Sequence, residues 1–589
     1  MNYLARKLVD LWQALARWYY NWRYGAVARK LETPEDRARR GFIIVQIDGL
    51  SYEQLQNAVA QGYAPYLATL LRSGDGECFR WCCGLPSTTP AVQAGIMFGS
   101  RYDVPGFRWY VKETQSSVVC KYPGALNAVQ QRLYEGRAGI LEKGASYANM
   151  FDGGATTSLF TLAAIGRTSL LEKVGGLGLF FVMLFSPLRV LRILWWSIWT
   201  YLSSAWRQLT SVFWPNKFSR IGLLTPFTSV LTDVVVREVE TFASLVDVYR
   251  GVPAIWVNYS SYDEWAHIFG PGDHYAYQAV RAIDAQIRQI DRMRRRMARR
   301  EYDLFVLSDH GMAPCVPFDK AFGSSFSQLI VDYAGKPLVT DETMNGARHA
   351  PAARALLEDE IAIAEGRLTG LSSGAARAVK KSLARRGERE PSGPARPTDV
   401  VVRNSGPLSH IYLNLSQAPM LLEEIEEAYP GFVERLAAHP GIGVVAVRSA
   451  EGPYMFTREG RYSCAGPPLP PSLLALREGE VASAELAKLL SYPHSGDLVV
   501  LGRWSVWDNE NLVVSFEKQQ GTHGGVGGEQ CFPFLLAVAQ SPRSFSLADG
   551  PEDLYRFFLS YGQAALAAER PAEKGEAQVV PSVKLAGRP

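Results

Sequence analysis

The chain has 589 residues, of which 47% are hydrophobic and 20% charged, so it can bury at least one sizeable core and is not a disordered protein. Its 62 lysines and arginines nearly balance 58 aspartates and glutamates; the formal net charge of +4 excludes a strong overall attraction to nucleic acid, and we expect no specific nucleic-acid binding. Seven cysteines are few for this length and odd in number, which does not resemble a disulfide framework and indicates a reducing compartment.

The first 40 residues predict a helix that is basic and amphipathic. In residues 1–31, leucines, tryptophans and a tyrosine share one helical stripe, while arginines and a lysine lie off it. Charged residues interrupt every apolar run there before it reaches the ~7–15 residues of a signal peptide, so we expect a cytoplasmic protein. The stripe suits either the inner face of the membrane or the protein's own core, and both interpretations stay open.

Three apolar, β-rich runs end in polar residues. The first, Phe42–Ile47, leads into Asp48 and then into helix-compatible sequence; the second is Ala254–Tyr259 and the third Asp303–Leu307. Between the last two, residues 275–300 have apolar positions at helical intervals, as expected of a crossover helix. This pattern predicts an open, mostly parallel α/β sheet flanked by helices, with a site at the carboxyl ends of its strands.

A further segment, residues 177–214, is rich in leucine, phenylalanine and tryptophan. Pro187, Arg189 and Arg192 divide it, so neither half reaches the ~20 apolar residues of a membrane-spanning helix. The polar strand ends also lie on both sides of it in sequence, and a single crossing would separate them. We therefore predict a helical insertion, at about residues 165–235, that lies on a membrane surface or docks on the protein itself.

These features divide the chain into a core, an inserted cap and two flanking segments. Residues 365–398 are rich in glycine, serine, proline and basic residues and predict a linker, and residues 400–465 suit a small α+β cap lobe. The core is expected to resume near Asp497–Leu501. The predicted order is an N-terminal segment (1–40), the first part of the core (41–335), the linker and cap lobe (336–480), the second part of the core (481–568) and a disordered tail (569–589).

Five short motifs supply carboxylates, imidazoles and a hydroxyl beside strand ends or glycine-containing turns. Two divalent metals ~3.5–4 Å apart can clamp the attacking and leaving oxygens of a phosphoryl transfer, and they need such ligands at fixed points. Taken singly, each motif is common in turns or on exposed helix faces. The motifs are Asp48-Gly49, Pro86-Ser-Thr-Thr89, Asp263-x-x-x-His267, Asp309-His310-Gly311 and Thr522-His523-Gly524-Gly525.

Together and in this order, the motifs resemble the alkaline phosphatase superfamily, and most closely its type I phosphodiesterase and nucleotide pyrophosphatase branch. The resemblance covers about residues 41–330 and 495–540. It includes the D-x-x-x-H-x-x-G-P spacing of residues 263–271 and the ten residues that separate Thr89 from Gly99. The resemblance implies a phosphoric ester hydrolase, most closely a phosphodiesterase.

The resemblance also implies a role for each motif. Thr89 would be the nucleophile and form a phosphothreonine, because metal coordination activates a hydroxyl that is otherwise a poor nucleophile; Thr88 is the adjacent candidate, which the spacing to Gly99 disfavours. Zinc is the expected metal for mixed His and Asp ligands, with manganese as the alternative. One metal would be held by Asp263, His267 and His523, and the other by Asp48, Asp309, His310 and the Thr89 oxygen.

The sequence departs from the branch where nucleotide pyrophosphatases offer an asparagine to the phosphate, since this chain has Pro105-Gly-Phe-Arg-Trp-Tyr110. Arg108 could bind a phosphate oxygen, and Trp109 or Tyr110 could stack on a base or line an acyl pocket; the alternative is a surface arginine beside core aromatics. This run and the apolar segment resemble bacterial proteins of the superfamily, which favours a lipid-linked phosphate ester.

Several functions therefore stay open at the level of sequence. The first is a phosphodiesterase that acts on a nucleotide or a lipid headgroup, with membrane surface contact through residues 1–31 and 177–214. The second is a phosphomonoesterase or phosphotransferase on a lipid-linked phosphate, and the third is a catalytically silent, membrane-associated scaffold. A sulfatase is disfavoured, because Cys83-Gly-Leu-Pro-Ser does not supply the C-x-P-x-R motif. His274 is the one other histidine close to a motif in sequence, seven residues after His267.

Overall fold

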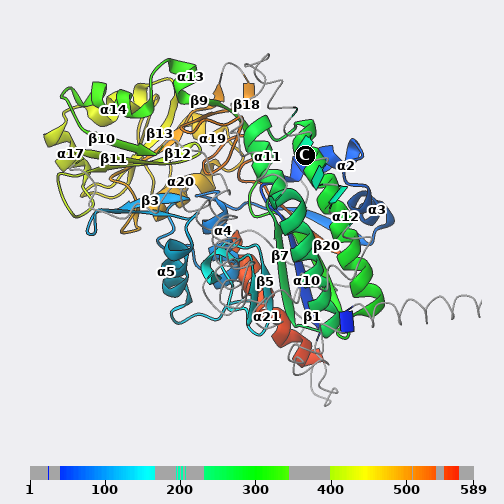
Figure 1. The fold of residues 1–589 in the computed structure, drawn as a ribbon. Coiled ribbons are helices and arrows are strands. Elements are labelled where there is room, and N and C mark those ends of the chain that lie inside the picture. The colour runs from blue at the N-terminus through cyan, green and yellow to red at the C-terminus, as the bar shows by residue number, and fades with distance from the viewer. Residues whose placement is uncertain are drawn as a thin grey trace, which may run out of the picture.

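The computed structural model describes residues 24–25, 40–165, 231–343, 398–506, 509–538 and 550–568, with isolated positions between 191 and 206. Most of the predicted N-terminal helix, the linker and the C-terminal tail lie outside the described residues. The described chain forms two lobes that lie side by side (Figure 1). No helix in the described ranges has the length and apolar character needed to cross a bilayer.

The core lobe is built on a seven-stranded sheet that confirms the predicted open, mostly parallel α/β fold. Its strands follow the order β2 (Gly76–Arg80), β20 (Phe534–Val538), β8 (Tyr302–Leu307), β1 (Gly41–Ile47), β7 (Ala254–Tyr259), β5 (Ala145–Tyr147) and β6 (Thr157–Leu159). The strands from β8 to β6 pair in parallel, and β20 runs antiparallel to both of its neighbours. The three predicted strands are β1, β7 and β8, which lie next to one another.

Both faces of this sheet are covered, which explains why β1 is apolar at nearly every position. On one face, Ile43 and Val45 pack with α2 (Tyr52–Ala60), α3 (Pro65–Ser73), α10 (Arg237–Arg250), α11 (Ser261–Phe269) and the predicted crossover helix, α12 (His274–Met297). On the other, Phe42 and Ile44 pack with α4 (Thr89–Phe98), α5 (Pro123–Tyr134) and α21 (Pro551–Ala568). A short 3-10 helix, η1 (Leu162–Ala164), and a π-helix, η2 (Leu231–Val236), complete this lobe.

The second lobe has its own seven-stranded sheet, mostly antiparallel. Its order is β10 (Thr340–Thr343), β11 (Val400–Ser405), β12 (Leu408–Leu413), β16 (Leu498–Gly502), β13 (Ile442–Val447), β14 (Tyr454–Thr457) and β15 (Gly460–Ser463). One face packs on α13 (Phe318–Phe322), α14 (Phe326–Ala334), α17 (Leu422–Ala428) and α18 (Phe432–Ala438). Side chains of the other face, with those of α19 (Pro471–Leu474) and α20 (Gly479–Leu490), join the apolar cluster around α4, so the two lobes share a core.

Two boundaries differ from the sequence prediction. The first part of the core was expected to run to residue 335, but α13 and α14 pack on the second sheet. The apolar run at 497–501 was expected to return the chain to the core, but β16 lies in the second sheet between β12 and β13. A buried apolar run does not specify which of two sheets it joins, because both offer the same environment. The strand that returns to the core sheet is β20.

Two smaller sheets connect the lobes. A four-stranded sheet contains β17 (Trp504–Val506), β18 (Asn509–Ser515), β9 (Ala313–Pro317) and β19 (Gly521–Thr522). A hairpin of β3 (Arg108–Val111) and β4 (Ser116–Val119) leaves the core lobe and packs on β11. Because β9 follows β8 and β19 precedes His523, the four-stranded sheet fixes where that histidine lies relative to the core strands.

Candidate metal centre

The carboxyl ends of three adjacent parallel strands meet the N-terminus of α4. Asp48 follows β1, Asp309 and His310 follow β8, and Asp263 lies in the first turn of α11, just after β7. The structure brings all seven residues predicted for the metal site into one buried cluster: Asp48, Thr89, Asp263, His267, Asp309, His310 and His523. Each contributes its polar atoms to the same small region.

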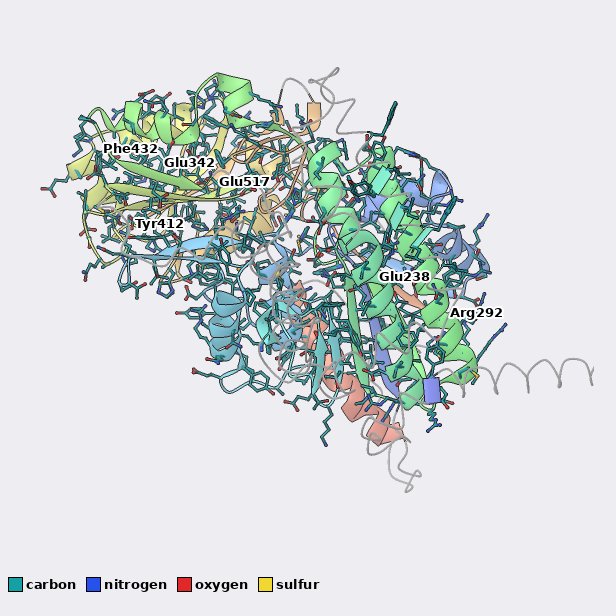
Figure 2. All side chains as sticks on the ribbon, viewed as in Figure 1. Glu238, Arg292, Glu342, Tyr412, Phe432 and Glu517 are labelled. Atoms are coloured by element: carbon teal, nitrogen blue, oxygen red, sulfur yellow. The ribbon has the colours of Figure 1, made fainter. Side chains whose placement is uncertain are left out.

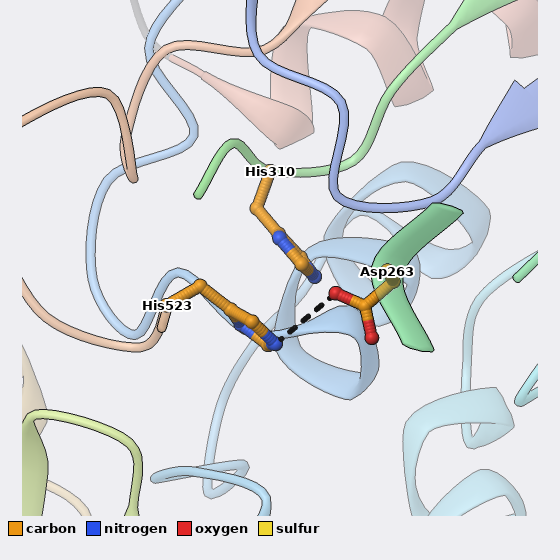
Figure 3. Close-up of side chains that lie close together, drawn as sticks. All are labelled: Asp263, His310 and His523. Carbon is orange, nitrogen blue, oxygen red and sulfur yellow. Dashed lines mark ion pairs between the residues drawn. The ribbon is translucent and has the colours of Figure 1, made fainter. Parts of the chain in front are cut away.

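The first group in this cluster joins α11 to the loop after β19. The Nε2 atom of His267 lies 3.3 Å from Oδ2 of Asp263, and Nε2 of His523 lies 3.6 Å from Oδ1 of the same carboxylate. The two Nε2 atoms are 3.2 Å apart. Figure 3 shows the Asp263 carboxylate and the rings of His523 and His310 directed into one space.

The second group surrounds the Thr89 hydroxyl. Nε2 of His310 lies 3.6 Å from Oδ1 of Asp48 and 3.5 Å from Oδ2 of Asp309. Oγ1 of Thr89 lies 3.1 Å from that Nε2 atom and 3.4 Å from Asp48 Oδ1. The two groups adjoin, since the His310 ring stacks on the His523 ring with centroids 3.8 Å apart.

The protons of the three histidines are fixed by backbone carbonyls. Nδ1 of His267 lies 2.8 Å from Gly521 O, Nδ1 of His523 lies 2.9 Å from Ser87 O, and Nδ1 of His310 lies 3.0 Å from Gly311 O. A carbonyl oxygen only accepts hydrogen bonds, so each Nδ1 carries the proton and each Nε2 presents a lone pair. Three such lone pairs beside three carboxylates form a donor set that fits divalent cations.

Burial and neighbouring charges shift the pKa values of three of these groups. Burial, and then the charge of Asp263, raises the pKa of Asp309 to about 7. Burial, and then the neighbouring His310, lowers the pKa of His523 well below its usual value. Burial lowers the pKa of His267 too, but the Asp263 carboxylate and further hydrogen bonds raise it more, so the net shift is upward. A cation would compensate the clustered carboxylates.

At two positions next to the ligands, close contacts leave room only for glycine. A Cβ atom on Gly311 would lie 1.9 Å from the carbonyl oxygen of Glu529, and one on Gly49 would lie 2.7 Å from Oδ1 of Asp263. Gly49 also has a φ of +73°, a conformation that glycine adopts without strain. Its N–H donates to Asp309 Oδ1 over 3.3 Å, so this turn joins the ends of β1 and β8.

A narrow cavity opens beside the cluster, and the second lobe supplies part of its lining. Ser405 and Gly406 come from the second lobe, and Glu517 and Gln519 from the segment between β18 and β19. Thr88, Phe107 and Arg108 come from the N-cap of α4 and the segment that follows this helix. Figure 2 shows Glu517 on the side of the second lobe that faces the core lobe. Arg108 is buried, forms an ion pair with Glu517 and donates to Asn404 O over 2.7 Å.

The other predicted substrate residues lie elsewhere. Trp109 is buried in the core shared by the lobes, and Tyr110 packs edge-on against Tyr412 with ring centroids 5.6 Å apart. Neither is among the residues that line the cavity, which agrees with the alternative of core aromatics. His274 lies at the start of α12, 2.6 Å from the Tyr63 hydroxyl, and belongs to neither group of ligands.

The sequence analysis missed three residues of the site. Asn258 donates to Asp48 Oδ2 over 3.1 Å, and its place near the end of β7 follows the rule that identified the other strand-end residues. Glu517 and Gln519 belong to no motif that could have identified them, because the folding of the second lobe and the four-stranded sheet brings them to the cavity.

A sequence family and several solved structures are similar to this chain. The sequence matches the family of type I phosphodiesterases / nucleotide pyrophosphatases over residues 42–358, more than half of the chain. No curated protein matches the sequence. Among solved structures, phosphonoacetate hydrolase from Sinorhizobium meliloti 1021 in complex with phosphonoformate is 14% identical, with a TM-score of 0.45; the match covers 90% of this chain and 97% of that one. Murine ectonucleotide pyrophosphatase / phosphodiesterase 5, inactive and in complex with AMP, is 12% identical, with a TM-score of 0.43 and coverage of 89% and 95%.

Proposed function

Since the chain belongs to the type I phosphodiesterase / nucleotide pyrophosphatase family and is therefore a metal-dependent hydrolase of phosphoric esters, we propose that it cleaves phosphodiesters through a two-metal site and a phosphothreonine at Thr89. One metal is assigned to Asp263, His267 and His523. The other is assigned to Asp48, Asp309, His310 and the Thr89 oxygen. Zinc is the proposed metal, with manganese as the alternative.

The position of the Thr89 hydroxyl is the observation that supports this proposal most directly. It lies 3.1 Å from His310 Nε2 and 3.4 Å from Asp48 Oδ1, at the first position of α4. The first N–H groups of a helix have no partner within the helix and favour a phosphate group. Bound metals would supply the positive charge that activates this hydroxyl and stabilises the phosphate oxygens.

The proposed reaction has two displacements. The Thr89 oxygen attacks phosphorus, the bond from phosphorus to the leaving oxygen breaks, and the leaving group departs as an alcohol with the proton of the hydroxyl. A water molecule then attacks the phosphothreonine, the bond to Thr89 breaks, and a phosphate monoester is released with the hydroxyl restored. The substrate is proposed to be a nucleotide or a lipid headgroup ester.

Replacement of Thr89 tests the chemistry. We expect Thr89→Ala to lower kcat for bis(p-nitrophenyl) phosphate by about 10³-fold or more while bound metal is retained, and Thr89→Ser to keep part of the activity because it keeps a hydroxyl. Acid quenching during turnover should trap a phosphorylated peptide that contains Thr89. Undiminished turnover by Thr89→Ala would rule out the nucleophile and leave only the family-level function.

The same assay separates the alternatives. A phosphodiesterase prefers bis(p-nitrophenyl) phosphate, whereas a phosphomonoesterase or phosphotransferase prefers p-nitrophenyl phosphate. A scaffold that has lost turnover hydrolyses neither, although the seven clustered groups argue against such a loss. A screen of nucleotide and lipid-headgroup diesters would then identify the substrate.

We also propose that the apolar insertion contacts the cytoplasmic face of a membrane. Six of its described side chains lie at helical positions three or four residues apart, and each is more than half exposed: Leu191, Leu194, Trp195, Ile198, Leu202 and Trp206. A helix with leucine and tryptophan along one exposed face suits the interface of a bilayer.

Flotation with lipid vesicles tests this contact. We expect the full chain to float with vesicles of anionic phospholipid, and a Trp195→Ser/Ile198→Ser variant to lose most of this binding with unchanged kcat/KM on a soluble substrate. The proposal fails if the full chain stays with the soluble fraction at every lipid concentration.

A further inference from the structure

The cavity beside the metal ligands is narrow enough that a substrate phosphate must touch both of its walls. The centre of a water molecule can occupy only about 20 Å³ of it, little more than one water molecule needs. Thr89, Asp263, His267 and His523 line it on the side of the proposed ligands. The rest of its lining, here called the second wall, includes Thr88, Arg108, Glu517 and Gln519. Groups on the second wall therefore decide which phosphate esters fit.

A hydroxyl and an amide oxygen on that wall are buried without a hydrogen-bond partner among the described residues. They are Oγ1 of Thr88 and Oε1 of Gln519, in side chains that are 1% and 5% exposed. A buried polar atom without a partner destabilises a protein by ~1–3 kcal/mol, so such atoms are rare unless a ligand completes them. Both atoms belong to residues that line the same cavity.

The hydrogen bonds around Gln519 determine what its amide offers to a ligand. As placed in the structure, Nε2 of Gln519 donates to Thr522 Oγ1 over 2.7 Å and to Ser515 Oγ over 3.3 Å, and Oε1 is the unpartnered atom. The same contacts also accommodate the amide turned by half a rotation. Both partners are hydroxyls and can donate, so Oε1 can occupy the inner position and the NH₂ group can point into the cavity. Ser515 Oγ also accepts from Glu517 N over 3.2 Å, which leaves its own proton for Gln519. In this orientation the inner position keeps its two hydrogen-bond partners, and the NH₂ group takes the position that has none.

Thr88 offers a second donor. It occupies the N-cap position of α4, but its side chain makes no capping hydrogen bond. Its methyl group faces the backbone of Gly524, since a Cβ atom built there would lie 3.5 Å from Thr88 Cγ2. No capping hydrogen bond therefore holds the Thr88 hydroxyl to the helix.

From these contacts, we infer that the Gln519 amide and the Thr88 hydroxyl bind the non-bridging phosphate oxygen that faces away from the metals, and that this neutral wall selects phosphodiesters. The charge of Arg108 on the same wall is balanced by Glu517, so the wall offers donors without net positive charge. Such a wall suits a phosphodiester, which carries one negative charge, better than a monoester, which carries two near neutral pH. This inference rests on the proposed two-metal hydrolase.

Three variants test the two donors. Thr88→Val and Gln519→Leu keep the side-chain volume and remove the donor; each should lower kcat/KM for bis(p-nitrophenyl) phosphate about 5- to 10-fold with unchanged bound metal. Gln519→Glu keeps the inner acceptor but turns a carboxylate toward the phosphate, so it should lower kcat/KM further than Gln519→Leu does. Gln286→Leu is the matched control, because this buried amide bonds to Glu238 away from the cavity; it should lower Tm and leave kcat/KM unchanged.

The outcomes separate this inference from the proposed function. If Thr89→Ala is inactive but Thr88→Val and Gln519→Leu retain the wild-type kcat/KM, the wall contact is wrong and the hydrolase stands. A Gln519→Glu variant as active as the wild type would also overturn the contact, since it would mean that the amide accepts rather than donates. If Gln519→Leu fails to fold, the kcat/KM of Thr88→Val alone decides whether the wall binds the phosphate. If Thr89→Ala is fully active, the proposed site itself is wrong.

Discussion

At the scale of single residues, we expect protons and metal ions to compete for Asp309. Burial and the charge of Asp263 raise the pKa of this carboxyl to about 7, so it is largely protonated below neutral pH when no cation is bound. A ligating carboxylate must lose its proton. We therefore expect the affinity of the metal-free protein for zinc to fall as the pH decreases from about 8 to about 6.

Calorimetric titration of zinc in two buffers with different ionisation enthalpies measures this competition. The apparent binding enthalpy should differ between the buffers, because binding releases protons. Asp309→Asn should bind zinc more weakly and show a smaller dependence on pH. An affinity that is constant over this range would contradict the raised pKa of Asp309.

Glu517 controls the charge that the cavity presents. The residue is buried beside Arg108, and the ion pair leaves the wall without net charge. In Glu517→Gln the guanidinium is no longer balanced, so the wall gains a positive charge. We expect kcat/KM for p-nitrophenyl phosphate to rise on the order of tenfold relative to that for bis(p-nitrophenyl) phosphate.

The matched control is Glu529→Gln. Glu529 is also buried and pairs with Arg80 and Arg477, but it does not line this cavity. Both variants should be less stable, because each leaves at least one arginine without its carboxylate: Arg108 is buried and Arg80 partly buried, whereas Arg477 is exposed. Only Glu517→Gln should change the substrate ratio; an equal change in both would mean that the ratio reports stability rather than charge.

At the scale of secondary-structure elements, Arg101 joins α20, α21 and the loop that leads to Thr89. Its guanidinium donates to Glu485 and to Glu552, each over 2.9 Å, and to the carbonyl oxygens of Cys83 and Leu85, each over 3.1 Å. Arg101→Met leaves two carboxylates and two carbonyls without this partner. We expect the variant to lose about 3–5 kcal/mol of unfolding free energy.

Denaturant unfolding and steady-state kinetics check this expectation together. Arg101→Lys keeps the charge but cannot form all four hydrogen bonds, so it should fall between Arg101→Met and the wild type in stability. The loop held by Arg101 precedes Thr89, so kcat should fall in both variants. A wild-type unfolding midpoint in Arg101→Met would show that these contacts do not stabilise the loop.

The packing of the elements also explains which parts of the fold could be predicted from the sequence. Strands β1, β7 and β8 were predictable because both faces are buried, so the run is apolar until a polar residue ends it. The same rule misassigned β16, which is equally apolar but lies in the second sheet. Glu517 and Gln519 could not be predicted, since their position depends on how two lobes pack and not on local sequence.

At the scale of the whole molecule, the second lobe is part of the site and not a separate cap. It shares an apolar core with α4 and supplies part of the second wall of the cavity. The segment that follows α4 carries many of the polar contacts between the lobes: Arg108 pairs with Glu517, Lys112 pairs with Asp497 over 2.7 Å, and Arg403 donates to Ser117. A change in lobe packing would therefore move the wall relative to Thr89.

One contact between the lobes depends on pH. Nδ1 of His494 lies 2.6 Å from Oδ2 of Asp103, which also pairs with Arg132, and Glu113 lies 3.9 Å from the His494 ring. The hydrogen bond to Asp103 raises the pKa of His494 above its usual value, against the opposing effects of burial and Arg132. A raised pKa means that the folded protein holds this proton more tightly than the unfolded chain. The stabilisation is therefore complete below about pH 6 and is lost as the pH rises through the folded-state pKa.

Comparison of wild type with His494→Gln at two pH values isolates this contribution. Near pH 5.5 the variant should be less stable by about 1 kcal/mol, the lower range for a hydrogen bond to a charged group that is partly exposed. Near pH 9 the neutral imidazole contributes little, so the two proteins should melt close together. Because each comparison is made at a single pH, the titration of the metal ligands affects both proteins alike. A difference in Tm of the same size at both pH values would mean that His494 joins the lobes by packing and not by charge.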